Sequence, residues 1–235
     1  MNVDVIKQSL IQFERRHSVA FSHMSSRQSS ILELGAIVGV QEHYRSNGFQ
    51  IRVENPHQAG RFFVKLSSRG DPWKYSRIIV TKGKITAELH MNLVVEGAHD
   101  KGRYCVDVGI VNPNRVPRKK PQLKWTCLPN NRLISFVEVK RLVIYPMLLA
   151  QFIGEVHEIA PQFLGCRKVY RCDRYRHLPA TLIALGHFSA NSSEIKESFH
   201  KRGYQVHIAE NFDVRVSLAR VRSTRSPLYW DHEKY

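Results

Sequence analysis

The chain has 235 residues, 43% of them hydrophobic, which is enough to bury a core as one domain or as two small ones. Its 36 Lys and Arg against 20 Asp and Glu leave a formal net charge of +16, which favours a polyanionic partner, nucleic acid before an anionic membrane, over a merely solvated basic surface. No apolar run approaches the roughly 18 residues of a membrane span, and no signal-peptide core begins the chain, so a cytoplasmic protein without a membrane partner is expected.

Two helices are predicted to open the chain. Apolar residues recur at helical spacing over residues 3–16. A second helix is expected to begin at a capping-box pair, Ser30 and Glu33, and to end at Asn47 and Gly48. Short extended segments separated by Gly, Pro, Asn and Ser follow, which indicates that a sheet begins there.

A hairpin is predicted next. Polar and apolar side chains alternate over residues 85–95, and a turn over 96–102 leads into a second strand at 103–111. The polar face of the first strand is expected to carry Glu88, His90 and Asn92. On the second strand, the same alternation places Asp107 on the face of Cys105 and Gly109.

The following segment, "RLISFVEVKRLVI" at residues 132–144, is rich in β-branched and apolar residues and should lie inside a sheet. It nevertheless carries two charges, Glu138 and Lys140, which share one face of the predicted strand. A strand inside a sheet is normally apolar, so the presence of a carboxylate and an ammonium on this one needs an explanation.

The remaining elements alternate between helix and strand. A helix is predicted over residues 145–160, a strand over 180–188, a helix over 191–203 and a strand over 204–210. This order indicates parallel strands joined by crossover helices. The prediction is one α/β domain, a mixed β-sheet flanked by helices. It has an N-terminal helical and β extension within residues 1–30, a core over 31–210 and a basic tail over 211–235.

Two basic segments interrupt these elements. Several prolines exclude a regular element over residues 112–132, and residues 165–177 mix arginines with tyrosines. Cationic side chains bind phosphates and aromatic rings stack on bases. The residues predicted to contact nucleic acid are Arg115, Arg118, Lys119, Lys120, Lys124, Arg171, Arg174 and Arg176. For the second segment, a solvated basic loop is the competing interpretation.

Asp107 and Glu138 lie on strands that are candidates to be neighbours. Two buried carboxylates repel each other, and the single ammonium of Lys140 cannot offset both charges. A divalent cation resolves this cost, and carboxylates with water suit Mg²⁺ or Mn²⁺. Such an ion polarises a phosphoryl oxygen and activates water, so the three residues indicate a phosphodiesterase. The competing interpretation is an edge strand with a solvated charged face and no metal.

The residues also carry a family resemblance. Asp107 in "VDVGIV", followed by Glu138 and Lys140 in "VEVK", resembles the D…ExK signature of the PD-(D/E)xK nuclease superfamily, which has the restriction-endonuclease-like fold. The predicted order of elements resembles the αβββαβ core of that superfamily over residues 30–190. Val106 stands before Asp107 in place of proline, as in many members.

The resemblance implies a role for each signature residue. Asp107 and Glu138 would hold Mg²⁺ or Mn²⁺, and the carbonyl of Val139 would complete the metal shell. Lys140 would position the nucleophile.

The resemblance also implies residues beyond the signature. Many members add a carboxylate from an earlier element, for which Glu88 is favoured over Glu33 and Glu42. Some families place a glutamine on the helix after the ExK strand, where Gln151 stands one turn before Glu155. A solvated polar face is the competing interpretation of that helical pair.

The expected function is a Mg-dependent endonuclease that hydrolyses phosphodiester bonds of nucleic acid, DNA in preference to RNA, as a homodimer or as a subunit of a multiprotein complex. The alternative is a catalytically silent nucleic-acid-binding subunit on the same fold. A scaffold or membrane-surface protein ranks last, because the sequence has no clear basic amphipathic helix with bulky apolar residues opposite.

Overall fold

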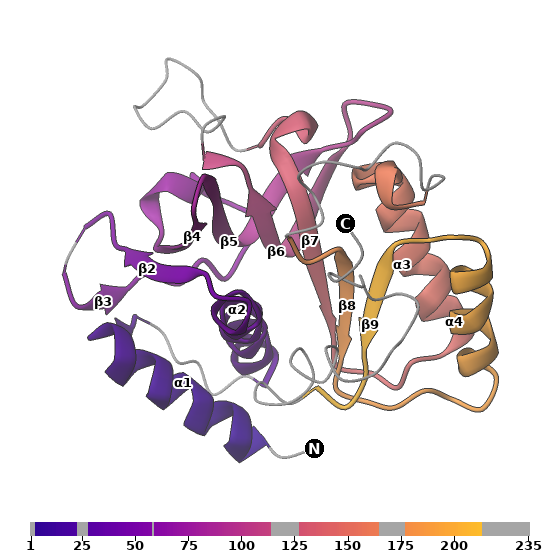
Figure 1. Ribbon diagram of the computed structural model, residues 1–235, viewed down its shortest axis with the longest axis horizontal. Coiled ribbons are helices and arrows are strands. Elements are labelled where there is room, and N and C mark those ends of the chain that lie inside the picture. The colour runs from indigo at the N-terminus through magenta and orange to yellow at the C-terminus, as the bar shows by residue number, and fades with distance from the viewer. Residues whose placement is uncertain (1–2, 23–27, 58, 114–126, 165–176, 213–235) are drawn as a thin grey trace.

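The computed structural model describes residues 3–22, 28–57, 59–113, 127–164 and 177–212 (Figure 1). The helices are α1 (Val3–His17), α2 (Gln28–Ser46), α3 (Pro146–Ile159) and α4 (Ser192–Lys201). The strands are β1 (Ala20–Phe21), β2 (Gln50–Glu54), β3 (Arg61–Phe62), β4 (Arg77–Lys82), β5 (Ile85–Glu96), β6 (Arg103–Val111), β7 (Leu133–Lys140), β8 (Ala180–Ala184) and β9 (Val206–Ala209). Short 3₁₀ turns lie at Pro72–Lys74, Asn130–Arg132 and Pro161–Phe163.

Seven of these strands form one mixed sheet in the order β2-β4-β5-β6-β7-β8-β9. Neighbours from β2 to β7 are antiparallel, whereas β8 is parallel to β7 and β9 is parallel to β8. β1 and β3 form a separate short parallel pair. The predicted hairpin is β5 with β6, and a helix connects the strands of each parallel pair in the seven-stranded sheet, as predicted. The α/β prediction is thus confirmed as a mostly antiparallel sheet flanked by helices.

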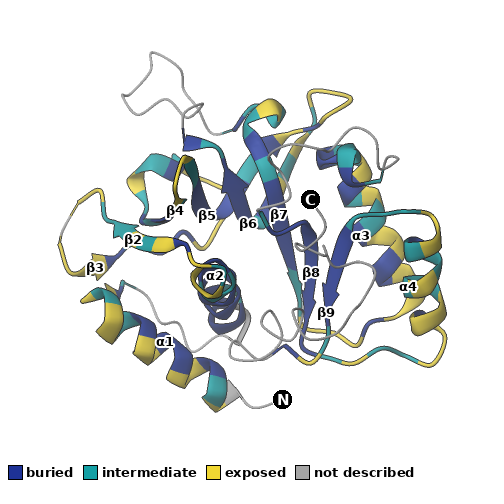
Figure 2. Cartoon of the chain, in the orientation of Figure 1, coloured by how far each residue is buried: buried dark blue, intermediate teal, exposed yellow. Residues whose placement is uncertain are grey.

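Helices cover both faces of this sheet. Successive residues of a strand point to opposite faces, and on β7 Val137 packs in one hydrophobic cluster while Phe136 packs in another. The cluster of Val137 contains side chains of α1 and α2, and the cluster of Phe136 contains side chains of α3 and α4. Most strands between the layers are largely dark blue in Figure 2, whereas the edge strand β2 is teal and yellow. Helices α1, α3 and α4 keep an exposed outer side, but α2 is buried over most of its length. Alternation places Glu138 on the same face as Phe136, toward α3.

The predicted N-terminal extension packs onto the core. Ile6, Leu10 and Phe13 of α1 join the cluster beneath α2. The ring of Phe13 also contacts Phe21 of β1 and Phe62 of β3, with centroid distances of 5.5 and 5.8 Å. The first helix and the short parallel pair therefore share the hydrophobic core of the sheet.

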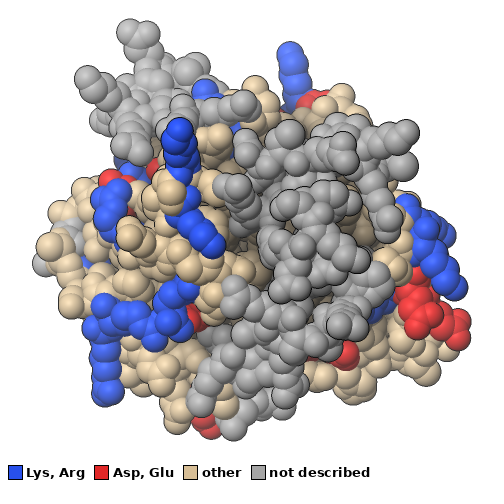
Figure 3. All heavy atoms as spheres, viewed as in Figure 1, with Lys and Arg blue, Asp and Glu red and all other residues tan. Residues whose placement is uncertain are grey.

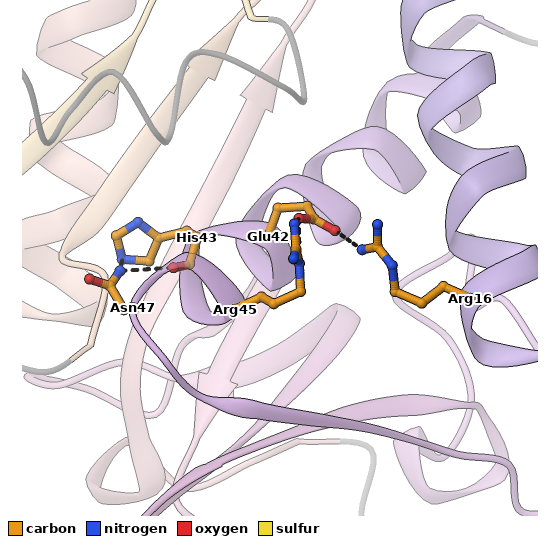
Figure 4. Close-up of polar contacts among 5 residues, drawn as sticks. All are labelled: Arg16, Glu42, His43, Arg45 and Asn47. Atoms are coloured by element: carbon orange, nitrogen blue, oxygen red, sulfur yellow. Dashed lines mark hydrogen bonds and ion pairs between the residues drawn. The ribbon is translucent and has the colours of Figure 1, made fainter.

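Helix α2 begins before the predicted capping box. It starts at Gln28, so Ser30 lies inside the helix, and the prediction of a cap formed with Glu33 is wrong. The end of α2 agrees with the prediction: Asn47 Nδ2 donates to the carbonyl of His43 at 2.8 Å (Figure 4), and Gly48 follows with φ of 79°. Because Glu33 does not cap the helix, its carboxylate is available to the sheet.

The alternation predicted for the hairpin breaks at Asn92. Met91 packs in the cluster of α1 and α2, but Leu93 packs in the cluster of α3 and α4. Their partners on β6, Val108 and Val106, change cluster in the same way. Asn92 has φ of 47°, the left-handed conformation that asparagine tolerates better than most residues. The predicted faces are therefore wrong at this point in both strands, because the regular two-residue alternation is interrupted.

Most of the predicted basic segments fall outside the described residues. All eight residues predicted to contact nucleic acid lie within 114–126 or 165–176, and the predicted basic tail is described only as far as Phe212. Across the described ranges, no helix combines the length and apolar character of a membrane span.

Candidate active site

The candidate site lies where β6 and β7 part. The ladder between these antiparallel strands ends at the pair Val108 and Val137. The next residues, Asp107 on β6 and Glu138 on β7, stand at the opening, while β7 runs on to its end alongside β8. Asp107 is also the residue at which β6 changes face. The prediction that these two strands are neighbours is confirmed.

Where β6 and β7 part, the Asp107 carboxylate replaces a backbone carbonyl as the hydrogen-bond acceptor for β7. Its Oδ2 accepts the N–H of Val139 at 2.7 Å. The carbonyl of the next residue, Lys140, accepts the N–H of Leu185 on the opposite edge of β7. Successive residues of a strand direct their backbone groups to opposite edges, so the carbonyl of Val139 faces Asp107 as well. This is the orientation that the predicted role of Val139 requires.

Glu138 is buried on a central strand. Its side chain is 6% exposed, and β7 has β6 on one side and β8 on the other. Glu138 Oε2 accepts a hydrogen bond from Lys140 Nζ at 3.2 Å, and the Lys140 side chain is 29% exposed. An edge strand with a solvated charged face is therefore wrong for this pair.

Burial raises the pKa values of both carboxyl groups. For Glu138, burial raises the pKa well above its ordinary value, and the neighbouring charge of Asp107 raises it further. For Asp107, burial also raises the pKa, against the lowering effects of the Val139 N–H and Lys140. Burial lowers the pKa of Lys140, but the surrounding carboxylates raise it by more, so that the pKa is raised overall. Glu138 makes the largest contribution among these carboxylates. The site thus concentrates more negative charge than its one ammonium offsets.

No protein-family model matches this chain. No curated protein and no solved structure matches it either. The resemblance to the PD-(D/E)xK superfamily therefore rests on the short signature and on the order of the elements.

Helix α3 brings Glu155 to the edge of the site. Gln151 Nε2 donates to Glu155 Oε1 at 3.2 Å, and among the described residues the buried Oε2 of Glu155 has no hydrogen-bond partner. Burial raises the pKa of Glu155, whereas Lys140 lowers it. The predicted site residue Gln151 is exposed and orients Glu155. The charge of Glu155 raises the pKa of Lys140.

Helix α2 brings Glu33 from the other side, through Asn92. The side-chain nitrogen of Asn92 donates to Glu33 Oε2 at 3.0 Å and to the carbonyl of Lys65 at 2.8 Å. Lys65 Nζ donates in turn to the carbonyls of Asn92 and Ser67. Burial raises the pKa of Glu33, the Asn92 hydrogen bond lowers it, and the charge of Asp107 raises it. Glu33 is thus the carboxylate of an earlier element that interacts with Asp107.

Glu88, the favoured candidate for that role, lies elsewhere. Its Oε2 is 3.1 Å from His90 Nε2 and 3.5 Å from Arg77 Nε. Its partner on β6 is Val111, four residues beyond Asp107, and four residues of strand span about 13 Å. The structure therefore does not bring Glu88 to the site, and the choice of Glu88 over Glu33 is corrected.

Glu42, the other candidate on α2, forms ion pairs away from the site. It forms ion pairs with Arg16 of α1 and with Arg45, one turn along α2 (Figure 4). Arg45 Nε donates to Glu42 Oε2 at 2.7 Å. Glu42 therefore links the two helices at their surface.

The donor set fits a small divalent cation. Mg²⁺ usually takes one or two carboxylates from a protein and keeps several waters, which matches Asp107 and Glu138. Within the described ranges, no group of three or more His, Cys, Asp and Glu side chains is placed to hold a metal ion. A closed site of four protein ligands, as structural zinc requires, is therefore not found in that part of the chain.

Asn92 and Lys65 are not among the predicted site residues. An asparagine in the middle of an apolar strand is a signal for an irregular backbone, because asparagine is rare in strands and tolerates left-handed conformations. Lys65 carries no such signal. Its contact with Asn92 joins residues 27 positions apart, which no local pattern predicts.

Replacing Asn92 is expected to separate its two roles. Asn92→Gly removes the side-chain hydrogen bonds to Glu33 and to the carbonyl of Lys65 and keeps the left-handed backbone accessible, at a cost of about 1–3 kcal/mol for the lost partners. Asn92→Ala removes the same bonds and strains the backbone, so it should be less stable than the glycine variant by about 1 kcal/mol. Urea denaturation of both variants measures the difference. Equal stability would show that the left-handed conformation is not required at this position.

Proposed function

We propose that the protein is a metal-dependent nuclease that hydrolyses phosphodiester bonds of nucleic acid, DNA in preference to RNA. The observation that carries the proposal is the meeting of Asp107, Glu138 and Lys140 where β6 and β7 part. Two crowded carboxylates attract a divalent cation, and an ammonium beside them can meet the charge of a phosphate. The formal charge of +16 supports a polyanionic substrate.

The proposed finer fold is restriction-endonuclease-like. In chain order, α2, β5, β6, β7, α3 and β8 give the succession α, β, β, β, α, β, with β2, β3 and β4 inserted after α2. The four strands β5, β6, β7 and β8 are also consecutive neighbours in the sheet. This order supports the resemblance on which the proposed residue roles depend.

Each residue of the cluster has a proposed role. Mg²⁺ or Mn²⁺ held by Asp107 and Glu138 would polarise a phosphoryl oxygen and lower the pKa of water. Lys140, hydrogen-bonded to Glu138 and partly exposed, would orient the attacking water or neutralise charge that develops on the phosphate. Glu33 and Glu155, one from each helical layer, add negative charge that favours cation binding.

The surface is consistent with an anionic substrate. Figure 3 shows basic side chains projecting from the described surface on both sides of the face in view, whereas acidic side chains group mainly at the right, over α4. Basic surface charge raises the rate at which a nucleic acid is captured.

The test is a cleavage assay on plasmid, single-stranded oligonucleotides and RNA, each with Mg²⁺, Mn²⁺ or EDTA. Wild type should cleave at least one substrate only when metal is present. Lys140→Met should lower the initial rate about 10²- to 10³-fold, because it removes one positive charge from the reacting phosphate. The matched control, Lys101→Met in the exposed turn between β5 and β6, should cleave like wild type. If wild type cleaves no substrate with either metal, the catalytically silent binding subunit replaces this proposal. If wild type and Lys140→Met cleave at the same rate, Lys140 has no catalytic role.

A further inference from the structure

A group of exposed apolar side chains follows the candidate site along the chain. Among the described residues, six large hydrophobic side chains are exposed, and four of them lie between Leu142 and Met147. The exposed fractions are 53% for Leu142, 43% for Val143, 39% for Tyr145 and 70% for Met147. These four residues are called the apolar ledge below.

The fold holds the backbone of the apolar ledge in place. Ile144, in its middle, is fully buried; its N–H donates to the carbonyl of His187 at 2.9 Å, and its carbonyl accepts the N–H of Ser189 at 2.8 Å. The chain passes so close to Gly186 that a Cβ there would lie 2.6 Å from the Cα of Val143. The packing of this segment thus fixes the exposure of the ledge.

The apolar ledge is also next to the proposed catalytic lysine. It begins two residues after Lys140 and runs into the first turn of α3, the helix that carries Glu155. Lys140 and Arg141 precede it, and residues 140–150 contain no Asp or Glu. The apolar ledge together with the positive charges of Lys140 and Arg141 suits a ligand that combines negative charge with flat apolar rings.

We propose that the apolar ledge binds unpaired bases of a single-stranded nucleic acid whose phosphate lies at Lys140. This inference rests on the proposed function and names the substrate class. In a duplex, the faces of the bases are stacked on one another, so apolar side chains beside a phosphate have no base face to contact. In a single strand the faces are free, and aromatic and apolar side chains stack on them without regard to sequence.

The test compares single-strand and duplex binding without cleavage. Fluorescence anisotropy in EDTA, at constant salt, gives the affinity for labelled oligothymidylate, labelled oligouridylate and a labelled duplex of equal length. Tyr145→Ser and Met147→Ser should each weaken single-strand binding about 5- to 100-fold and leave duplex binding unchanged. The two single-stranded probes separate DNA from RNA. Ile11→Ser, on the 40% exposed apolar position of α1, is the matched control and should bind like wild type.

Any one of three results would overturn the inference. The first is an unchanged single-strand affinity in both ledge variants, and the second is an equal fall of single-strand and duplex affinities. The third is a change of oligomeric state in the variants, measured by light scattering, which would make the apolar ledge an interface between copies of the chain. The outcome is independent of catalysis, because EDTA excludes metal-dependent cleavage. If the ledge variants weaken single-strand binding but wild type does not cleave in the metal assay, the proposed nuclease activity is refuted and a single-strand-binding surface remains. If wild type cleaves but the ledge variants bind single strands normally, only the inference about the apolar ledge is refuted.

Discussion

Glu138→Gln is expected to abolish metal-dependent cleavage while the protein stays folded. The substitution keeps the size of a buried side chain that is hydrogen-bonded to Lys140 and removes the charge that a divalent cation would bind. A loss of about 4 kcal/mol of transition-state stabilisation corresponds to a rate about 10³-fold lower. The measurement is the initial rate at saturating Mn²⁺ on the best substrate of wild type.

Two further variants make this result specific. Asp107→Asn should lose activity to the same extent, and the double variant should lose little more, because residues that hold one ion act as a unit. Glu96→Gln, at the exposed end of β5, controls for the loss of one negative charge and should retain the wild-type rate. A Glu138→Gln protein with more than about a tenth of wild-type activity would contradict the proposed role, since one tenfold step is only about 1.4 kcal/mol.

The same substitution should stabilise the metal-free protein at and above neutral pH. The pKa of Glu138 is raised by burial, so between its ordinary value of 4.5 and its folded value the folded protein holds a proton that the unfolded chain has lost. The free energy of unfolding of wild type therefore falls as pH rises through that interval. Glutamine does not ionise, so the stability advantage of Glu138→Gln grows from near zero at low pH to a plateau. The plateau is about 1.4 kcal/mol for each unit by which the folded pKa exceeds the unfolded one.

Urea denaturation of both proteins from pH 4 to pH 9, in EDTA, measures this difference. The lowered pKa values of His17 and His207 make both proteins more stable as pH rises toward about 6.5, and this effect cancels in the difference. Adding Mn²⁺ at pH 8 should stabilise wild type, by about 2.7 kcal/mol at a hundred times the dissociation constant, and stabilise Glu138→Gln much less. A pH-independent difference would show that this carboxylate has no raised pKa. Equal stabilisation of both proteins by Mn²⁺ would show that it does not contribute to metal binding.

Local patterns in the sequence predicted the elements that frame the candidate site. The apolar period of residues 145–160 predicted α3, and the strands on either side of it are parallel, as the β, α, β order required. The same patterns placed Asp107 and Glu138 on neighbouring strands. These predictions hold because hydrophobic periodicity and chain order depend on residues that are close in the sequence.

By itself, the sequence thus determined the mixed α/β class, the strands of the D…ExK residues and the burial of a charged strand. Only the tertiary structure decided which other side chains meet them. The register between β5 and β6 pairs Glu88 with Val111, four residues from Asp107, whereas the side chain of Asn92 binds Glu33 of α2. Both depend on contacts between residues far apart in the chain, such as the 59 positions between Glu33 and Asn92, and a two-residue or helical period carries no information about such contacts.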